Sequence, residues 1–290
     1  MCGGLAPVGG LVPGAALRRA VGSVCMSRIH AVLLDLDETL LHDRASTDAA
    51  LLTTTADCCA RRGVDPLRLA GAVRGAADDL WVAGPGYEHC RRLGISAMEG
   101  MWAAFALGED ADTAGLREFC PRYRRAVWGR ALEAVGQVPD RDLCALLAER
   151  FVWERASRQI PFAETLPTLV ALRAAGAAIC VVTNGDRDLQ RRKVSDSGLL
   201  PFLDHLVISG EIGIGKPEPG IFEYALARCH AAPGVAVMVG DSAGRDVAGA
   251  VAAGVRAVWL DRFGAGNRPD GVWRVLPDLR RLPQILFEEG

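Results

Sequence analysis

The sequence predicts an α/β protein, built on a doubly wound parallel sheet with an all-helical domain inserted into it. Three observations predict this fold. Short apolar runs, each long enough for one buried strand, recur along the chain. Amphipathic helical patterns lie between the later runs. The long segment after the first run shows helical patterns and no convincing strand.

The predicted strands are apolar without alternation, which is typical of strands covered on both faces of a parallel sheet. They are residues 30–34, 177–183, 205–209, 235–240 and 256–260. Helices are predicted between them, with apolar residues at helical spacing, at residues 166–176, 220–230 and 245–254. This alternation of strand and helix indicates a Rossmann-like sheet core.

Three regions follow from this pattern. Residues 28–46 and 160–290 form the predicted sheet core, and residues 47–159 form a helical cap domain. Residues 1–27 are rich in Gly and Ala, and we expect a disordered N-terminal tail there. Met26 stands just before the first strand, and the sequence does not decide between it and Met1 as the start.

Composition narrows the possible partners. The formal charge is −2 with no basic tract, which argues against a nucleic-acid binder. No apolar run approaches the roughly 18 residues of a membrane helix, and the start lacks a secretory signal. The nine cysteines are scattered without a CxxC pair, so we expect reduced, buried thiols in a cytoplasmic protein. We expect a monomer or a homodimer. Of 33 cationic residues, only Lys193 and Lys216 are lysine.

The first strand runs directly into two carboxylates. In "AVLLDLDETLL", Asp35 and Asp37 are separated by one leucine, so an extended chain points both toward one site. Carboxylates this close repel each other unless a cation or a shared proton relieves them, and Mg²⁺ is the hard cation that usually accompanies phosphates. A polar turn without chemistry is the alternative interpretation.

Three other predicted strands also end in polar residues. Thr183 and Asn184, in "VVTNG", offer a hydroxyl and an amide to an anion, although an ordinary Asn-Gly turn fits as well. Asp241, in "VMVGDSAGRD", suits a Mg²⁺ ligand. Asp246 could cap the following helix or orient Asp241 or the nearby lysine.

Lys216 lies in "GEIGIGKPEPGIF", which matches the spacing of a nucleotide-binding P-loop. That loop needs Ser or Thr after the lysine, whereas Pro217 follows here and removes an amide donor. A P-loop is therefore disfavoured. A lysine kept in a chain that otherwise uses arginine indicates a need for a compact ammonium group.

The segments "DLDET", "VVTNG", "GKPEPGIF" and "VGDSAGRD" resemble the four motifs of the haloacid dehalogenase (HAD) superfamily of phosphohydrolases. The resemblance covers residues 29–260. Residues 183–226 look especially like the helical-capped branch of N-acylneuraminate-9-phosphatase and related sugar-phosphate and nucleotide phosphatases.

The resemblance implies a Mg²⁺-dependent phosphatase acting on a small phosphorylated metabolite such as a sugar, cyclitol or nucleotide phosphate. Asp35 would be the nucleophile that forms an aspartyl-phosphate, and Asp37 the general acid and base. Mg²⁺ would be held by Asp35, the Asp37 main-chain carbonyl and Asp241. Phosphoryl oxygens would contact Thr183, the Asn184 amide and Lys216, with Asp246 in support.

Three alternatives stay open. A 2-haloacid dehalogenase on the same fold also uses an aspartate nucleophile, but it has no use for the second acid, Asp37. A phosphomutase would need additional cap residues, which the sequence does not reveal. A non-catalytic binding domain would be expected to have lost one of the four charged residues Asp35, Asp37, Lys216 and Asp241, and all are present.

Overall fold

The computed structural model describes residues 29–264 and 266–287, so the predicted tail, residues 1–27, lies outside the described residues. Its centre is a six-stranded sheet with strand order β3-β2-β1-β4-β5-β6, in which every neighbouring pair is parallel. The strands are β1 (Ala31–Leu34), β2 (Ala178–Thr183), β3 (His205–Ile208), β4 (Ala236–Gly240), β5 (Arg256–Leu260) and β6 (Arg274–Leu276). The predicted doubly wound α/β core is confirmed.

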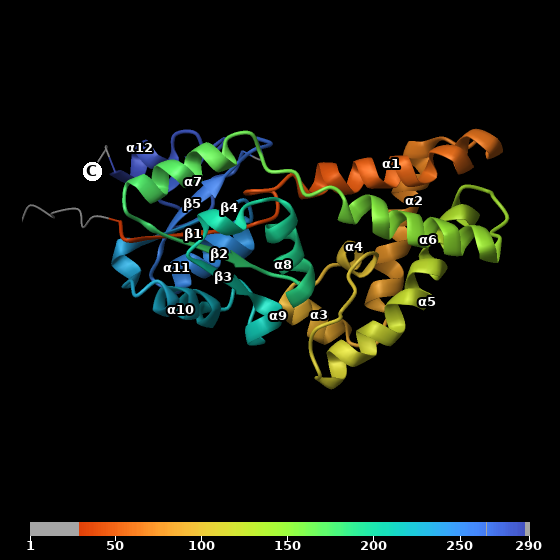
Figure 1. Cartoon of the computed structure of the whole chain (residues 1–290), viewed down its shortest axis with the longest axis horizontal. Coiled ribbons are helices and arrows are strands. Elements are labelled where there is room, and N and C mark those ends of the chain that lie inside the picture. Colours follow the sequence, from red (N-terminus) through yellow and green to blue (C-terminus); the bar gives the residue numbers. More distant parts are fainter. Residues whose placement is uncertain (1–28, 265, 288–290) are drawn as a thin grey trace, which may run out of the picture.

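Both faces of the sheet are covered by helices (Figure 1). Alternate residues of β1 point to opposite sides, so Val32 and Leu34 pack into one apolar cluster while Ala31 and Leu33 pack into another. The first cluster receives α7 (Thr165–Ala174), α8 (Arg187–Asp196) and α12 (Leu282–Phe287). The second receives α10 (Pro219–Arg228) and α11 (Ala248–Ala252). Strands buried in this way explain the unbroken apolar runs of the sequence.

The helices inserted between β1 and β2 build a separate hydrophobic core, at the right of Figure 1. They are α1 (Asp43–Arg62), α2 (Pro66–Val82), α3 (Tyr87–Leu93), α4 (Ala97–Gly100), α5 (Ala111–Ala134) and α6 (Arg141–Ala156), and are called the helical insertion below. Side-chain carboxylates cap the first turns of α2, α5 and α6, from Asp65, Asp110 and Asp140. The buried Trp81, Trp102 and Trp128 belong to this core, and Trp153 is exposed.

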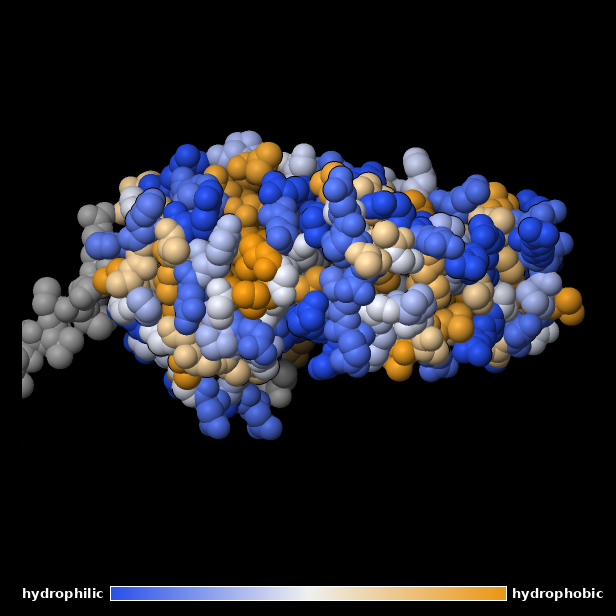
Figure 2. Space-filling view, turned by 90° about the horizontal axis from the view of Figure 1, so that it is seen from below, coloured by the Kyte–Doolittle hydropathy of each residue, from blue (hydrophilic) through white to orange (hydrophobic). Residues whose placement is uncertain are grey.

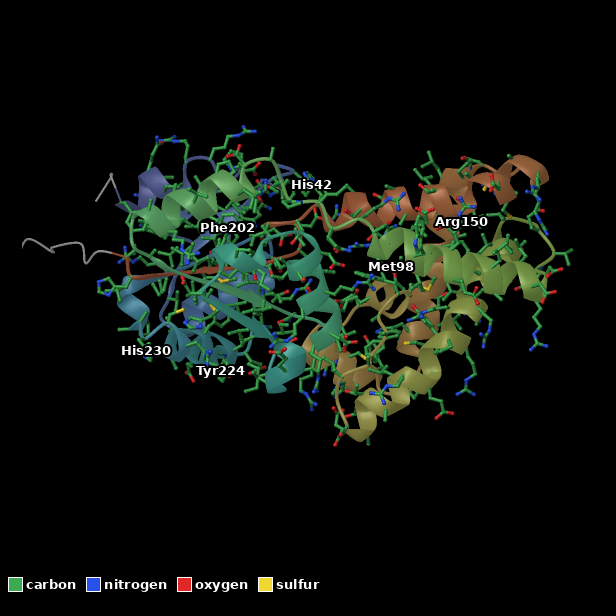
Figure 3. All side chains as sticks on the ribbon, in the orientation of Figure 1. His42, Met98, Arg150, Phe202, Tyr224 and His230 are labelled. Atoms are coloured by element: carbon green, nitrogen blue, oxygen red, sulfur yellow. The ribbon has the colours of Figure 1, made fainter. Side chains whose placement is uncertain are left out.

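The two connections between the sheet core and the helical insertion lie side by side. The main-chain N–H of His42 donates to Ile160 O at 2.9 Å, and Phe162 N–H donates to Leu40 O at 3.0 Å. The rings of His42 and Phe162 are 3.6 Å apart, and Figure 3 shows His42 at this junction. Helix α1 begins at Asp43, four residues before the predicted boundary of the cap at residue 47.

The helical insertion also meets the sheet core through its α3–α4 loop. Ser209, the first residue of α9 (Ser209–Ile212), donates its hydroxyl to Leu93 O at 2.6 Å. Gly94 lies against Asn184 with a left-handed φ of +71°, which glycine adopts without strain. The outline of the molecule is indented between the two parts on the face in Figure 2, where hydrophilic and hydrophobic residues are intermixed.

Two features of the core differ from the sequence prediction. Strand β6 was not predicted, because it has three residues of which only Leu276 is buried. The helix predicted at residues 245–254 starts earlier, as a π-helical turn at Ala243–Val247 that continues into α11. Ser242 begins this turn, and its hydroxyl accepts a hydrogen bond from Arg245 N–H at 3.2 Å.

Two composition-based expectations can be compared with the structure. The seven cysteines among the described residues are all free, and six of them are buried while Cys229 is half-buried. Within residues 29–264 and 266–287, no helix combines the length and apolar character needed to span a bilayer.

Candidate active site

The carboxyl ends of parallel strands share one edge of a sheet, and here the ends of β1, β2 and β4 border a single cavity of about 260 Å³. All seven residues singled out from the sequence line it: Asp35, Asp37, Thr183, Asn184, Lys216, Asp241 and Asp246. Four further residues complete the lining: Glu38, Arg44, Ser242 and Arg245. A larger cavity, about 440 Å³, lies between α1 and α6 of the helical insertion, and none of these seven residues lines it.

Lys216 is the centre of a buried charge cluster. Its Nζ is 2.6 Å from Asp35 Oδ1 and 2.6 Å from Asp246 Oδ1. The second carboxylate oxygen of Asp246 accepts from Ser242 N–H at 2.9 Å. Asp246 therefore supports Lys216, which is one of the two supporting roles that the sequence left open.

The loop that carries Lys216 is fixed by the side chain of Asn184. Asn184 Oδ1 accepts from Lys216 N–H at 2.7 Å, and Asn184 Nδ2 donates to Lys216 O at 2.8 Å. The side-chain amide of Asn184 thus binds the Lys216 loop through both its oxygen and its nitrogen. The contact of the Asn184 amide with a phosphoryl oxygen stays a prediction.

The carboxylates at the ends of β1 and β4 repel one another. Burial, and then the charge of Asp246, raise the pKa of Asp35, while Lys216 lowers it in part. Burial raises the pKa of Asp241 to about 7, with Asp35 and Asp246 adding to the rise. The site therefore holds more negative than positive charge.

A divalent cation would balance this excess. Carboxylate oxygens of Asp35, Asp241 and Asp246 lie within 4.8 Å of one another, and oxygen donors of this kind suit Mg²⁺. Both carboxylate oxygens of Asp246 already accept hydrogen bonds, from Lys216 Nζ and from Ser242 N–H. Asp35 and Asp241 are therefore the two side chains whose chemistry best fits a metal ion.

Asp37 lies in a different environment from Asp35, although only one residue separates them. Its Oδ2 accepts hydrogen bonds from Lys193 Nζ at 2.8 Å and from Gln190 Nε2 at 3.3 Å, both on α8. Burial and the nearby Asp43 raise the pKa of Asp37 to about 6, whereas Lys193 lowers it. A carboxyl group with a pKa near neutrality can both donate and accept a proton at physiological pH.

The turn between Asp37 and α1 places Glu38 in an unusual backbone conformation. Glu38 has a φ of 60°, the left-handed region that non-glycine residues rarely enter. Its carboxylate accepts from Arg44 N–H at 2.5 Å. Arg262 donates to Glu38 O at 2.9 Å and to Thr39 O at 2.8 Å, so the turn is fixed from both sides.

Comparison with known proteins assigns the family. The family model described as "Hydrolase: haloacid dehalogenase-like hydrolase" matches residues 29–254. The chain is 39% identical over 251 residues to a phosphoserine phosphatase of Thermus thermophilus, covering 86% of this chain and 94% of that protein. The chain belongs to the haloacid dehalogenase-like hydrolases.

Other relatives agree with this membership. Human N-acylneuraminate-9-phosphatase is 33% identical over 116 residues, which is 39% of this chain and 47% of that protein. The crystal structure of the HAD hydrolase YfnB from Bacillus subtilis, bound to magnesium, shares the fold with a TM-score of 0.61. It is 21% identical and covers 89% of this chain and 99% of its own. Within the family, the named sequence relatives are phosphatases, so the chain is a phosphoric monoester hydrolase.

Two residues of this HAD site were not predicted from the sequence. The first is Lys193, which is 1% exposed and contacts Asp37. The second is Asp43 at the start of α1, whose Oδ1 lies 2.9 Å from Lys193 Nζ. A signal for Lys193 did exist, since it is one of only two lysines in the chain and the other is Lys216. Asp43 gave no such signal, because an aspartate near a helix start is common.

Proposed function

We propose that the protein is a Mg²⁺-dependent phosphatase that hydrolyses a small phosphate monoester through an aspartyl-phosphate on Asp35. One observation carries the proposal: two aspartates at the end of β1 are held by the chain's two lysines in separate environments. Lys216 contacts Asp35, and Lys193 contacts Asp37. This separation suits one carboxylate for attack and the other for proton transfer.

The reaction has two steps. A carboxylate oxygen of Asp35 attacks phosphorus, the bond from phosphorus to the leaving oxygen breaks, and Asp37 gives its proton to that oxygen. A water molecule then attacks phosphorus, Asp37 takes a proton from it, and inorganic phosphate leaves while Asp35 is restored. Lys216 neutralises charge on the phosphoryl group, so much of the catalysis is electrostatic.

Asp35 and Asp241 are the side chains that would hold the metal ion. Bound Mg²⁺ supplies positive charge to the two carboxylates and the phosphoryl oxygens. The residues themselves fit this role because burial and mutual repulsion raise the pKa of both. A third oxygen ligand, the main-chain carbonyl of Asp37, stays a prediction from the family resemblance.

Metal removal and two matched variants test this function. Turnover of p-nitrophenyl phosphate should disappear with EDTA, return with Mg²⁺ and be inhibited by Ca²⁺, whose looser coordination does not keep the in-line geometry. Asp35→Asn should abolish turnover. Asp37→Asn should give a burst of nitrophenol and a phosphorylated Asp35 detectable by mass spectrometry, because attack survives and hydrolysis loses its base. Full activity in EDTA, or faster turnover of 2-haloacids than of any phosphate ester, would refute the proposal.

For the substrate we propose a phosphate monoester with a carboxylate on its other end, and O-phosphoserine as the first candidate. Arg44 and Arg245 are exposed residues that line the cavity beside Glu38. Guanidinium groups pair well with a carboxylate, and Glu38 could face an ammonium group. The phosphoserine phosphatase relative supports the same choice. A cavity of about 260 Å³ suits a small metabolite better than a nucleotide.

Matched substrates test this choice. O-phosphoethanolamine lacks only the carboxylate of O-phosphoserine, so kcat/KM should fall by at least about tenfold if one charged contact is lost. Arg44→Met should remove part of that preference, whereas Arg68→Met, at an exposed position of α2, should not. Equal kcat/KM on the two esters would exclude recognition of the substrate carboxylate. The proposal that the protein is a phosphatase would still stand. A panel of sugar, cyclitol and nucleotide phosphates would then be decisive.

A further inference from the structure

The two carboxylate oxygens of Asp37 are not equivalent. Oδ2 accepts hydrogen bonds from Lys193 and Gln190. Oδ1 is buried and accepts no hydrogen bond from any donor within the described part of the chain. The carboxyl group is therefore anchored through one oxygen, and the other is left without a donor. A carboxyl group fixed in this way is held in one orientation at the end of β1.

Lys193 is itself held by contacts on several sides. It is 1% exposed, and its Nζ is 2.9 Å from Asp43 Oδ1 and 5.8 Å from the centre of the Trp102 ring. Asp43 also pairs with Arg155. The guanidinium carbon of Arg155 lies 4.6 Å from the centre of the Trp102 ring. An ammonium group with two carboxylate partners and an aromatic neighbour has little freedom to move.

The partners of Lys193 come from the junction between the two parts of the molecule. Asp43 is the first residue of α1, and Arg155 lies in the last turn of α6, next to the two connections that join the helical insertion to the sheet core. Lys193 belongs to α8 of the sheet core. The chain of contacts Asp37–Lys193–Asp43–Arg155 thus crosses from the β1 loop to the helical insertion.

We propose that Lys193 is a positioning residue for proton transfer: it fixes the carboxyl group of Asp37 through Oδ2 and ties this acid to the junction through Asp43 and Arg155. The inference rests on the proposed phosphatase mechanism. As the bond from phosphorus to the leaving oxygen breaks, the proton moves from the Asp37 carboxyl group to that oxygen. The ammonium of Lys193 keeps its own protons and neutralises the carboxylate that remains.

The leaving group separates this role from a merely structural one. Benzyl phosphate and p-nitrophenyl phosphate each carry one ring, but benzyl alkoxide needs protonation and p-nitrophenolate leaves well without it. For Lys193→Met, kcat/KM should fall by about 10²-fold on benzyl phosphate and by less than about tenfold on p-nitrophenyl phosphate, since kcat/KM reports the first chemical step. On p-nitrophenyl phosphate, where the first step is little affected, a burst should precede steady-state turnover, because hydrolysis of the aspartyl-phosphate is slowed.

Arg192→Met is the matched control. Arg192 precedes Lys193 on α8, and its exposed side chain pairs with Asp196 at 3.1 Å on the surface. Its loss should leave both esters within about twofold of the original kcat/KM, because an exposed ion pair contributes little.

A second variant covers the case in which Lys193→Met fails to fold. Removing the lysine alone leaves Asp37 and Asp43 buried without their shared cation, which is costly. The double variant Lys193→Met with Asp43→Asn removes one charge of each sign, and it should show the same leaving-group dependence. Equal losses on the two esters in the folded variant, or no loss on either, would overturn the inference. Turnover of both esters by the unaltered protein tests the phosphatase mechanism separately.

Discussion

Replacing Lys216 by arginine keeps the charge and changes only its shape, so this substitution tests whether the site needs an ammonium group. Lys216 Nζ is 2.6 Å from Asp35 Oδ1 and from Asp246 Oδ1, and the lysine side chain is 2% exposed. A planar guanidinium is larger and directs its donors along a fixed fork, so it cannot keep both contacts within this closed space.

The expected loss in kcat/KM can be estimated from these contacts. One hydrogen bond between charged groups contributes about 1.5–3 kcal/mol, and one preorganised contact to transition-state charge contributes about 2.7–4 kcal/mol. About 3 kcal/mol corresponds to roughly 10²-fold, because each 1.4 kcal/mol is tenfold. We therefore expect Lys216→Arg to lower kcat/KM by at least about 10²-fold.

The assay is turnover of p-nitrophenyl phosphate at saturating Mg²⁺, together with thermal unfolding to confirm that the variant folds. Arg192→Lys is the control, because it makes an Arg/Lys exchange on the surface, where the side chain of Arg192 is 54% exposed. A folded Lys216→Arg enzyme within about threefold of the original kcat/KM would show that Lys216 is only part of a turn, and the electrostatic argument would fail.

Two further predictions concern the helical insertion where it meets the sheet core. A Cβ at Gly94 would lie 2.6 Å from Asn184 Nδ2, so Gly94→Ala should displace that side chain and lower kcat/KM by roughly tenfold. Gly63→Ala is the control, because Gly63 has a similar φ of +65° but nothing within 4 Å of the added Cβ. It should cost only about 1 kcal/mol of stability and leave activity unchanged. Burial raises the pKa of Glu99 from 4.5 to about 7, so the folded state holds a proton that the unfolded state has released between these pH values. The free energy of unfolding should therefore fall by about 3 kcal/mol across this window relative to Glu99→Gln, measured by urea denaturation at several pH values, and parallel pH profiles for the two proteins would contradict the shift.

Much of the fold could be predicted because its strands are buried on both faces. Five apolar runs of the sequence correspond to β1 to β5, since a strand that packs helices on both sides has no polar position to interrupt the run. The exception is β6, where Arg274 and Val275 are exposed and only Leu276 is buried. A three-residue edge strand of that kind carries no pattern that distinguishes it from a loop.

The site was predictable to the extent that it is made at strand ends. Asp35 and Asp241 follow parallel strands and Thr183 ends one. The carboxyl ends of these strands share one edge, so the sequence alone places the three residues together. Lys193 could not be placed in the same way. It projects from a helix, and 156 residues separate it from Asp37 in the sequence, so only the packing of α8 against the β1 loop brings the two together.

The distribution of lysine has a consequence for chemical labelling. Lys193 and Lys216 are the only lysines, and as whole residues they are 1% and 5% exposed, so both ammonium groups are buried. Amine-directed acylating reagents therefore find no lysine amine on the outside of the folded protein. Acylation of either lysine would report opening of the region between the sheet core and the helical insertion, and it would remove the charge that holds Asp35 or Asp37. The rate of labelling at these two positions thus measures how often the site opens.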